Sequence, residues 1–271
     1  MFAACLLAAT AIVGPATAQR SDAELFAFEP GAVADTDVRV AERYSVAMTL
    51  PMRALGAVRL QDAITPTSVS WSGAKPKRAL RAGEILVPAG PDRGVYCAPI
   101  PQGIWTTPTF CLRDTDGDGR FDANLSANFT SGRAQGILVT DKGKLYGVDF
   151  SKPSPLPSPI PYARAALTES PVIQVQLRWA TTFSPKRPTN GPVTISFWFD
   201  GGADGAAGQV RSDEQTIIRG EGSQIQLGGL RLQVLGLDGK GRVRYQIEGI
   251  DPDRPLHFNQ TPMANQMTIY L

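Results

Sequence analysis

Strict alternation of apolar and polar residues is the feature that most limits the fold of this chain. From residue 173 to residue 179, Ile, Val, Leu and Trp occupy the odd positions, and Gln, Gln and Arg occupy the even ones. A period of two places the two sets of side chains on opposite faces of a β-strand. Similar runs cover residues 193–199 and 38–50, and we expect Pro51 to end the latter strand. The sequence therefore predicts an all-β, antiparallel fold, either a sandwich or an open barrel.

A proline-rich stretch predicts where the chain divides. Prolines occupy positions 153, 155, 157, 159 and 161. Each proline lacks an N–H donor and has a fixed φ, so we expect polyproline II and no hydrogen-bonded ladder. We interpret residues 151–161 as a semi-rigid linker between two small β modules, an N-terminal domain of residues 19–150 and a C-terminal domain of residues 162–271. The alternative is an extended segment that packs across one larger domain.

The first eighteen residues predict export. Residues 1–18 are apolar and end in Ala16-Thr17-Ala18 before Gln19. This is the pattern of a signal peptide with its cleavage site, although no Lys or Arg precedes the apolar run. We therefore expect a secreted or periplasmic protein, and no further stretch of the sequence predicts a membrane span.

The cysteines predict one disulfide. Removal of Cys5 with the signal peptide leaves Cys97 and Cys111. An even pair in an exported chain indicates a disulfide, with two free thiols as the alternative. The bond would close a loop of about fifteen residues and contribute about 3 kcal/mol. Trp105 lies inside this loop, where it could plug the core or stack on a ligand.

The most specific chemical pattern follows the second cysteine. Counting Asp114 as position 1, carboxylates fall at positions 1, 3, 5 and 9, and a glycine falls at position 6. Calcium takes six to eight oxygen ligands, and a short loop must turn sharply to supply them. The expected ligands are Asp114, Asp116, Asp118, the carbonyl of Arg120, and Asp122.

These nine residues resemble the calcium loop of EF-hands and of related loops that lack the flanking helices. The resemblance implies a bound Ca²⁺ with a structural role. Position 12 is Leu125, where the EF-hand pattern has a bidentate Glu, so we expect a weak site with a Kd of ~10⁻⁴–10⁻³ M. The flanking segments lack helical periodicity, and a full EF-hand is not expected. The alternative is a hydrated Asp/Gly turn without an ion.

Other chemistry is missing from the sequence. The net charge is +2, and the basic residues are scattered among carboxylates, which argues against a nucleic-acid partner. The single histidine, His257, cannot build a zinc site with two disulfide-bonded cysteines. No G-x-S-x-G motif and no phosphate-binding glycine loop is present. The sequence therefore assigns no catalytic and no cofactor-binding residue beyond the calcium ligands.

Two functions remain open. The favoured hypothesis is an exported, non-enzymatic protein with a binding, surface or envelope role, whose ligand is a polysaccharide or a surface protein. The alternative is a secreted polysaccharide hydrolase that uses two carboxylates and a structural calcium. Several glutamates are available for such a pair, and nothing in the sequence selects two of them: Glu42, Glu84, Glu214, Glu221 and Glu248.

Overall fold

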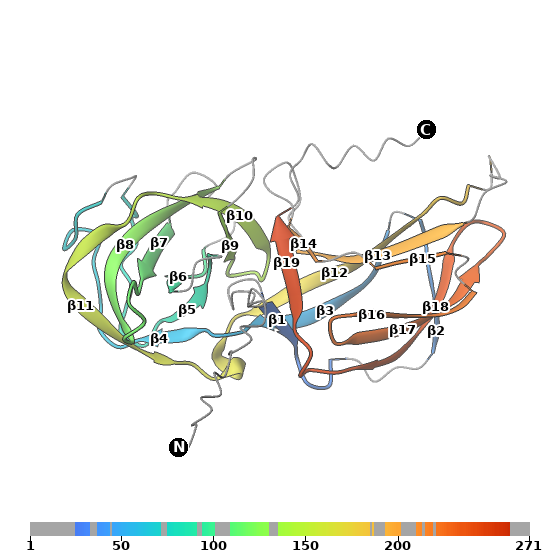
Figure 1. Cartoon of the computed structure of the whole chain (residues 1–271), viewed down its shortest axis with the longest axis horizontal. Coiled ribbons are helices and arrows are strands. Elements are labelled where there is room, and N and C mark those ends of the chain that lie inside the picture. Colours follow the sequence, from blue (N-terminus) through green and yellow to red (C-terminus); the bar gives the residue numbers. More distant parts are fainter. Residues whose placement is uncertain are drawn as a thin grey trace, which may run out of the picture.

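The computed structural model describes residues 25–32, 37–43, 45–71, 75–90, 94–100, 109–129, 135–184, 186, 193–201, 210–212, 215–218 and 221–260. Within these ranges the chain is built of antiparallel strands and contains no α-helix, which confirms the predicted fold class (Figure 1). The described residues also include a 3-10 turn, η2 (Leu167–Glu169). No helix in the described part is long and apolar enough to span a membrane. The predicted signal peptide and Trp105 lie outside the described residues.

Six strands close into a first barrel, at the left of Figure 1. The pairing of β11 with both β4 and β8 completes the circle. A β-hairpin continues from β8 beyond the barrel. The six strands are β4 (Val58–Leu60), β5 (Ile85–Pro88), β6 (Val95–Cys97), β7 (Thr109–Arg113), β8 (Arg120–Phe129) and β11 (Ser154–Arg164). The hairpin consists of β9 (Gly136–Val139) and β10 (Leu145–Phe150).

Six other strands close into a second barrel, and a four-stranded sheet packs with it around one continuous core. The barrel strands are β1 (Leu25–Phe28), β3 (Val46–Ala54), β12 (Val172–Thr181), β13 (Thr194–Asp200), β14 (Val210–Ser212) and β19 (Leu256–Gln260), with β15 (Gln215–Ile218) paired to β13. The sheet consists of β2 (Val38–Ala41), β16 (Glu221–Leu227), β17 (Leu230–Leu237) and β18 (Val243–Ile250).

The alternation along β12 explains how this core forms. Ile173, Val175 and Leu177 are fully buried, whereas Gln174 between them is exposed. Burial of such aliphatic side chains contributes about 1.5–3 kcal/mol each, so the strand keeps one face inward. The alternation therefore predicted both the strand and the side of it that faces the core.

The expected strand over residues 38–50 is divided in two. β2 belongs to the four-stranded sheet and β3 to the second barrel, and the N–H of Ser45 donates to the carbonyl of Glu42 at 3.1 Å in the turn between them. The expectation that Pro51 ends the strand is wrong, because β3 continues to Ala54. A proline is tolerated there because β1 ends at Phe28, opposite Met52, so Pro51 lies at the end of that ladder, where its carbonyl still accepts the N–H of Glu29 at 3.2 Å.

The proline-rich stretch also departs from expectation, because it pairs with neighbours. Residues 154–164 form β11, which runs antiparallel to β8 and β4 with an irregular register between Pro155 and Ile160. The prolines alternate with residues that retain an N–H, and their carbonyls remain acceptors. The carbonyl of Pro161 accepts the N–H of Gln61 at 3.1 Å, and the N–H of Tyr162 donates to Gly119 at 3.2 Å. A polyproline segment can therefore close a barrel.

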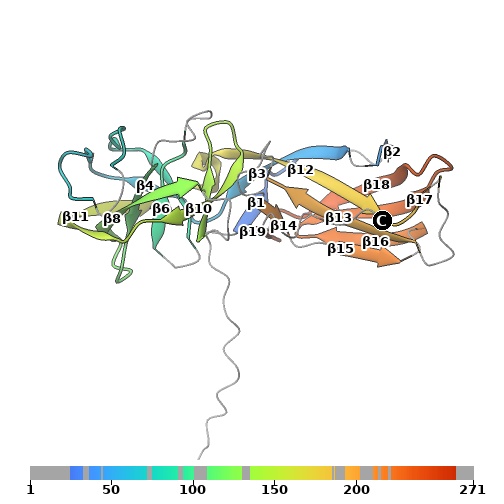
Figure 2. The same ribbon diagram turned by 90° about the horizontal axis from the view of Figure 1, so that it is seen from above.

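The two barrels interleave along the chain. β1 and β3 precede the first barrel in sequence, yet they pair with strands that follow it. The two barrels lie side by side along the long axis of the molecule, in both views (Figures 1 and 2). The β9–β10 hairpin joins them, because the N–H of Leu145 donates to Gly201 at 3.1 Å and Leu145 is buried in the second core. The division of the chain into two separate β domains stays a prediction.

Candidate metal centre

The acidic segment connects β7 and β8 of the first barrel. Three residues before Asp114, Cys111 is bonded to Cys97 of β6, directly opposite it in the ladder, with a Cα–Cα distance of 4.1 Å. This confirms the predicted disulfide. The bond fixes the strand that leads into the acidic loop.

Asp114 lies at the base of the loop and is only 3% exposed. Its Oδ1 accepts the backbone N–H of Gly117 at 2.7 Å, and its Oδ2 accepts that of Gly119 at 3.1 Å. The hydroxyl of Tyr162, on β11, donates to the same Oδ2 at 2.6 Å. A buried carboxylate needs such donors, and here three of them stabilise its charge.

These contacts determine the protonation states of Asp114 and Tyr162. Burial by itself would raise the pKa of Asp114, but the hydrogen bonds from Tyr162, Gly117 and Gly119 outweigh it and hold the pKa below the ordinary value of 3.8. Burial and then the bond to Asp114 raise the pKa of Tyr162, because both favour the neutral hydroxyl. At neutral pH the pair is a carboxylate and a protonated phenol.

Three of the predicted ligands converge. One carboxylate oxygen from each of Asp114, Asp116 and Asp118 lies within 4.8 Å of the others, so the cluster could hold a metal ion. Asp116 and Asp118 are exposed, and each accepts a backbone N–H two residues later, at 3.3 and 2.8 Å. Gly117 and Gly119 have φ of +79° and +86°. Only glycine adopts this region without strain, as expected for the sharp turn at position 6.

The other two predicted ligands, Arg120 and Asp122, lie outside this cluster of three carboxylates. Arg120 uses its backbone N–H to bond Asp118, and the role of its carbonyl as a ligand stays a prediction. Asp122 lies on β8 outside the group of three and accepts the hydroxyl of Thr115 through Oδ2. Its Oδ1 is buried and has no hydrogen-bond partner in the described part of the chain. Leu125 is buried in an apolar cluster with both cysteines, which fits its unsuitability as a ligand.

The support for the loop comes from residues that the sequence analysis missed. The ring of Tyr162 stacks on Phe121 with centroids 4.4 Å apart, and Tyr96 packs against both. Gly94 accepts the N–H of Asp114 at 2.9 Å, and a Cβ on Gly94 would lie 2.1 Å from the Asp114 carbonyl oxygen. Tyr162 is 48 residues from Asp114, and no sequence signal joins the two.

A second region was also missed. The basic residues are not all scattered, as the sequence had suggested, because Lys75, Lys77, Arg78 and Arg81 are exposed on one connection of the first barrel. This cluster of four basic residues within seven positions is visible in the sequence itself.

Comparison with family models, curated proteins and solved structures finds no match for this chain.

Proposed function

We propose that this protein is an exported, non-enzymatic β protein with a binding or envelope role, in which Ca²⁺ stiffens the acidic loop of the first barrel. The observation that carries the proposal is the convergence of three carboxylates, from Asp114, Asp116 and Asp118, on one point. No Lys or Arg of the described residues forms an ion pair with these three, so a cation from solution is the natural counter-charge.

The ligand set would extend beyond the three carboxylates. The carbonyl of Arg120 and the carboxylate of Asp122 occupy positions 7 and 9 of the EF-hand-like pattern. Position 9 of such loops often binds calcium through a water, which suits an aspartate set back on β8. The buried Oδ1 of Asp122, without a partner among the described residues, is available for that contact. The same backbone hydrogen bonds would also stabilise an ion-free turn, and experiment separates the two.

Thermal unfolding tests the proposal. If the Kd is about 10⁻⁴–10⁻³ M, about 10 mM CaCl₂ added to chelated protein should stabilise it by about 1.4–2.7 kcal/mol, because the ion binds only the folded state. For a chain of this size that is a rise in Tm of about 3–10 °C. Asp116→Ala should abolish the rise.

The matched control is Asp62→Ala, which removes an exposed aspartate from another loop of the same barrel. This variant should keep the full response to calcium. An unchanged melting curve for the wild-type protein would overturn the proposal, and so would an equal rise in the Asp116→Ala variant.

Among the described residues, no observation favours the hydrolase. Its general acid needs a raised pKa, whereas the carboxyl groups of Asp114, Glu169 and Asp238 all have pKa values shifted downward. Two hollows on the first barrel contain one carboxylate each, Glu84 in one and Asp62 in the other. A carboxylate pair in a cleft is what the hydrolase would require.

A further inference from the structure

The connection between β4 and β5, residues 61–84, carries an exposed basic segment. Lys75, Lys77, Arg78 and Arg81 contribute four positive charges and Glu84 one negative charge, so residues 75–84 carry a net charge of +3. Connections of this length inside a compact fold are uncommon and often functional. The segment is therefore a candidate binding surface.

The base of this connection is fixed to the barrel. Ile64 and Leu80 exchange two backbone hydrogen bonds, of 3.0 and 2.9 Å, and both side chains are buried. Trp71 packs edge-on against Phe110 with ring centroids 4.6 Å apart, and its indole N–H donates to the carbonyl of Pro66 at 3.0 Å. The cations are thus presented from an anchored loop.

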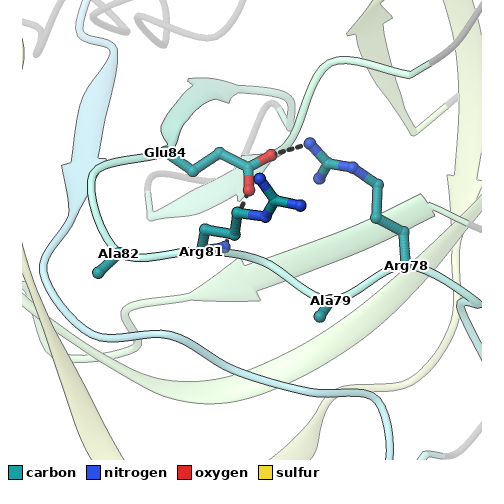
Figure 3. A pocket seen from close by; sticks show the side chains of 5 residues that line it. All are labelled: Arg78, Ala79, Arg81, Ala82 and Glu84. Carbon is teal, nitrogen blue, oxygen red and sulfur yellow. Dashed lines mark hydrogen bonds and ion pairs between the residues drawn. The ribbon is translucent and has the colours of Figure 1, made fainter.

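The basic segment borders a hollow of about 610 Å³, lined by Arg78, Ala79, Arg81, Ala82 and Glu84. Figure 3 shows the guanidinium of Arg78 bonded to the carboxylate of Glu84, and the side chain of Arg81 beside them. Glu84 forms an ion pair with Arg78 and accepts the backbone N–H of Arg81 at 3.0 Å. Its side chain is 13% exposed, against 53% for Arg78, so the carboxylate is held in place while the cation remains open to solvent.

Positive charge remains available in this hollow, from Arg81, and on the adjoining segment, from Lys75 and Lys77. Within the described part of the chain, the guanidinium of Arg81 and the ammonium groups of Lys75 and Lys77 have no ion-pair or hydrogen-bond partner. A guanidinium binds a carboxylate through two parallel hydrogen bonds, which ammonium groups reinforce as point charges. The hollow therefore suits a ligand that brings its own anionic group.

We propose that this basic segment binds an acidic polysaccharide whose sugars carry carboxylates. Arg81 and Arg78 would take the sugar carboxylate, Glu84 would accept a sugar hydroxyl, and the alanine methyl groups would contact the ring. Lys75 and Lys77 would meet further carboxylates along the polymer. The inference deepens the binding role proposed above, on which it rests, but it does not depend on the calcium loop.

The neighbouring groups disfavour other polyanions. Glu84 places a negative charge inside the hollow, which repels the dense phosphates of nucleic acid more than a sparsely charged glycan. The aromatic side chain of the connection, Trp71, packs against Phe110 and does not line the hollow, so no ring of the described residues is placed there to stack on a base. Leu80 is buried, so the segment presents no large apolar side chain for insertion into a lipid surface.

The experiment measures binding of the full chain to polygalacturonate, a polymer of a carboxylate sugar, by titration calorimetry in chelator. The chelator matters because the polymer itself binds calcium. We expect binding at about 20 mM salt that weakens at about 150 mM salt, where screening is stronger, and no binding of neutral dextran. Lys77→Gln combined with Arg81→Gln should weaken binding about fivefold or more, because two charge-assisted contacts are lost.

The matched control is Arg231→Gln combined with Lys240→Gln, which removes the same charge from exposed positions at the four-stranded sheet. Its affinity should stay within about twofold of the wild-type value, since non-specific attraction alone would weaken equally in both variants. The proposal is overturned if polygalacturonate does not bind, if the two double variants lose affinity equally, or if polyglutamate, single-stranded DNA or anionic vesicles bind more tightly. None of these outcomes alters the calcium-dependent melting, so the two proposals fail separately.

Discussion

Two turns rich in Asp and Gly, one in each half of the chain, manage negative charge in different ways. Residues 238–242 turn the β17–β18 hairpin, and Asp238 accepts the N–H groups of Lys240 and Arg242, each at 2.9 Å. The guanidinium of Arg242 closes the turn with an ion pair of 2.6 Å. This turn carries its own counter-charge, and hydrogen bonding with Arg242 holds the pKa of Asp238 below its ordinary value.

The acidic loop of the first barrel uses the same backbone device without the cation. Asp114 accepts two N–H groups, as Asp238 does, but its third donor is the neutral hydroxyl of Tyr162. Asp116 and Asp118 add two further charges beside it. The comparison shows that the turn at Asp238 is neutralised by an arginine of its own chain. The three carboxylates of the acidic loop have no such arginine in the described part of the chain and keep the capacity to bind a metal ion.

The largest expected effect concerns the support beneath the acidic loop. Cys97→Ala combined with Cys111→Ala should lower the free energy of unfolding by about 3 kcal/mol, because the open chain gains the entropy of a loop of about fifteen residues. Urea denaturation measures this loss. Wild-type protein in reductant should lose the same amount, and a loss below about 1 kcal/mol would show that the strands hold the loop unaided.

The next effect tests the neutral donor. Tyr162→Phe should cost about 1–2 kcal/mol, because it removes the hydroxyl from a buried carboxylate and keeps the ring on Phe121. Urea denaturation again gives the value. In an Asp114→Asn background the cost should shrink, since the charged acceptor is gone, and a double-mutant cycle isolates this coupling. Equal costs in the two backgrounds would mean that the hydroxyl does not stabilise the charge.

The smallest expected effect is that an Asp→Asn substitution changes the stability in opposite directions in the two turns. In chelator, Asp116→Asn should raise stability by about 0.5 kcal/mol or less, because it relieves repulsion among three carboxylates. Asp238→Asn should instead lower stability, because it weakens the ion pair with Arg242. Melting temperatures of both variants at low salt measure the signs. A fall in both cases would show that the acidic loop is already neutralised within the protein.

Local patterns predicted the strands, whereas the closure of the barrels depends on contacts that no local pattern contains. Alternation along residues 173–179 predicted β12 and its buried face. The pairings of β1 with β19 and of β3 with β12 join segments that are far apart in the chain, so the sequence could suggest a sandwich or an open barrel but not closure. The proline rule failed for β11 because it counts the missing donors and neglects the carbonyls that still accept.

The candidate site divides in the same way. The spacing of Asp114, Asp116 and Asp118 predicted their convergence, because residues so near in sequence meet in a tight turn. Tyr162 and Gly94, which support the turn, come from other strands and leave no trace in its spacing. The basic segment at residues 75–81 was visible in the sequence, but its significance depends on the anchored connection that presents it.

The point where the first barrel joins the rest of the chain has a consequence for how such a protein can change. Residue 53, near the end of β3, lies directly opposite residue 172, the start of β12, so the polypeptide leaves and re-enters the second barrel at one place. The hydrogen-bonded circuit of the second barrel needs no strand from the 117 residues 55–171. The body that bears both charged loops is therefore linked to the second barrel through two adjacent chain crossings, and its exchange for another body would also have to replace the β9–β10 side chains, such as Leu145, that fill part of the second core.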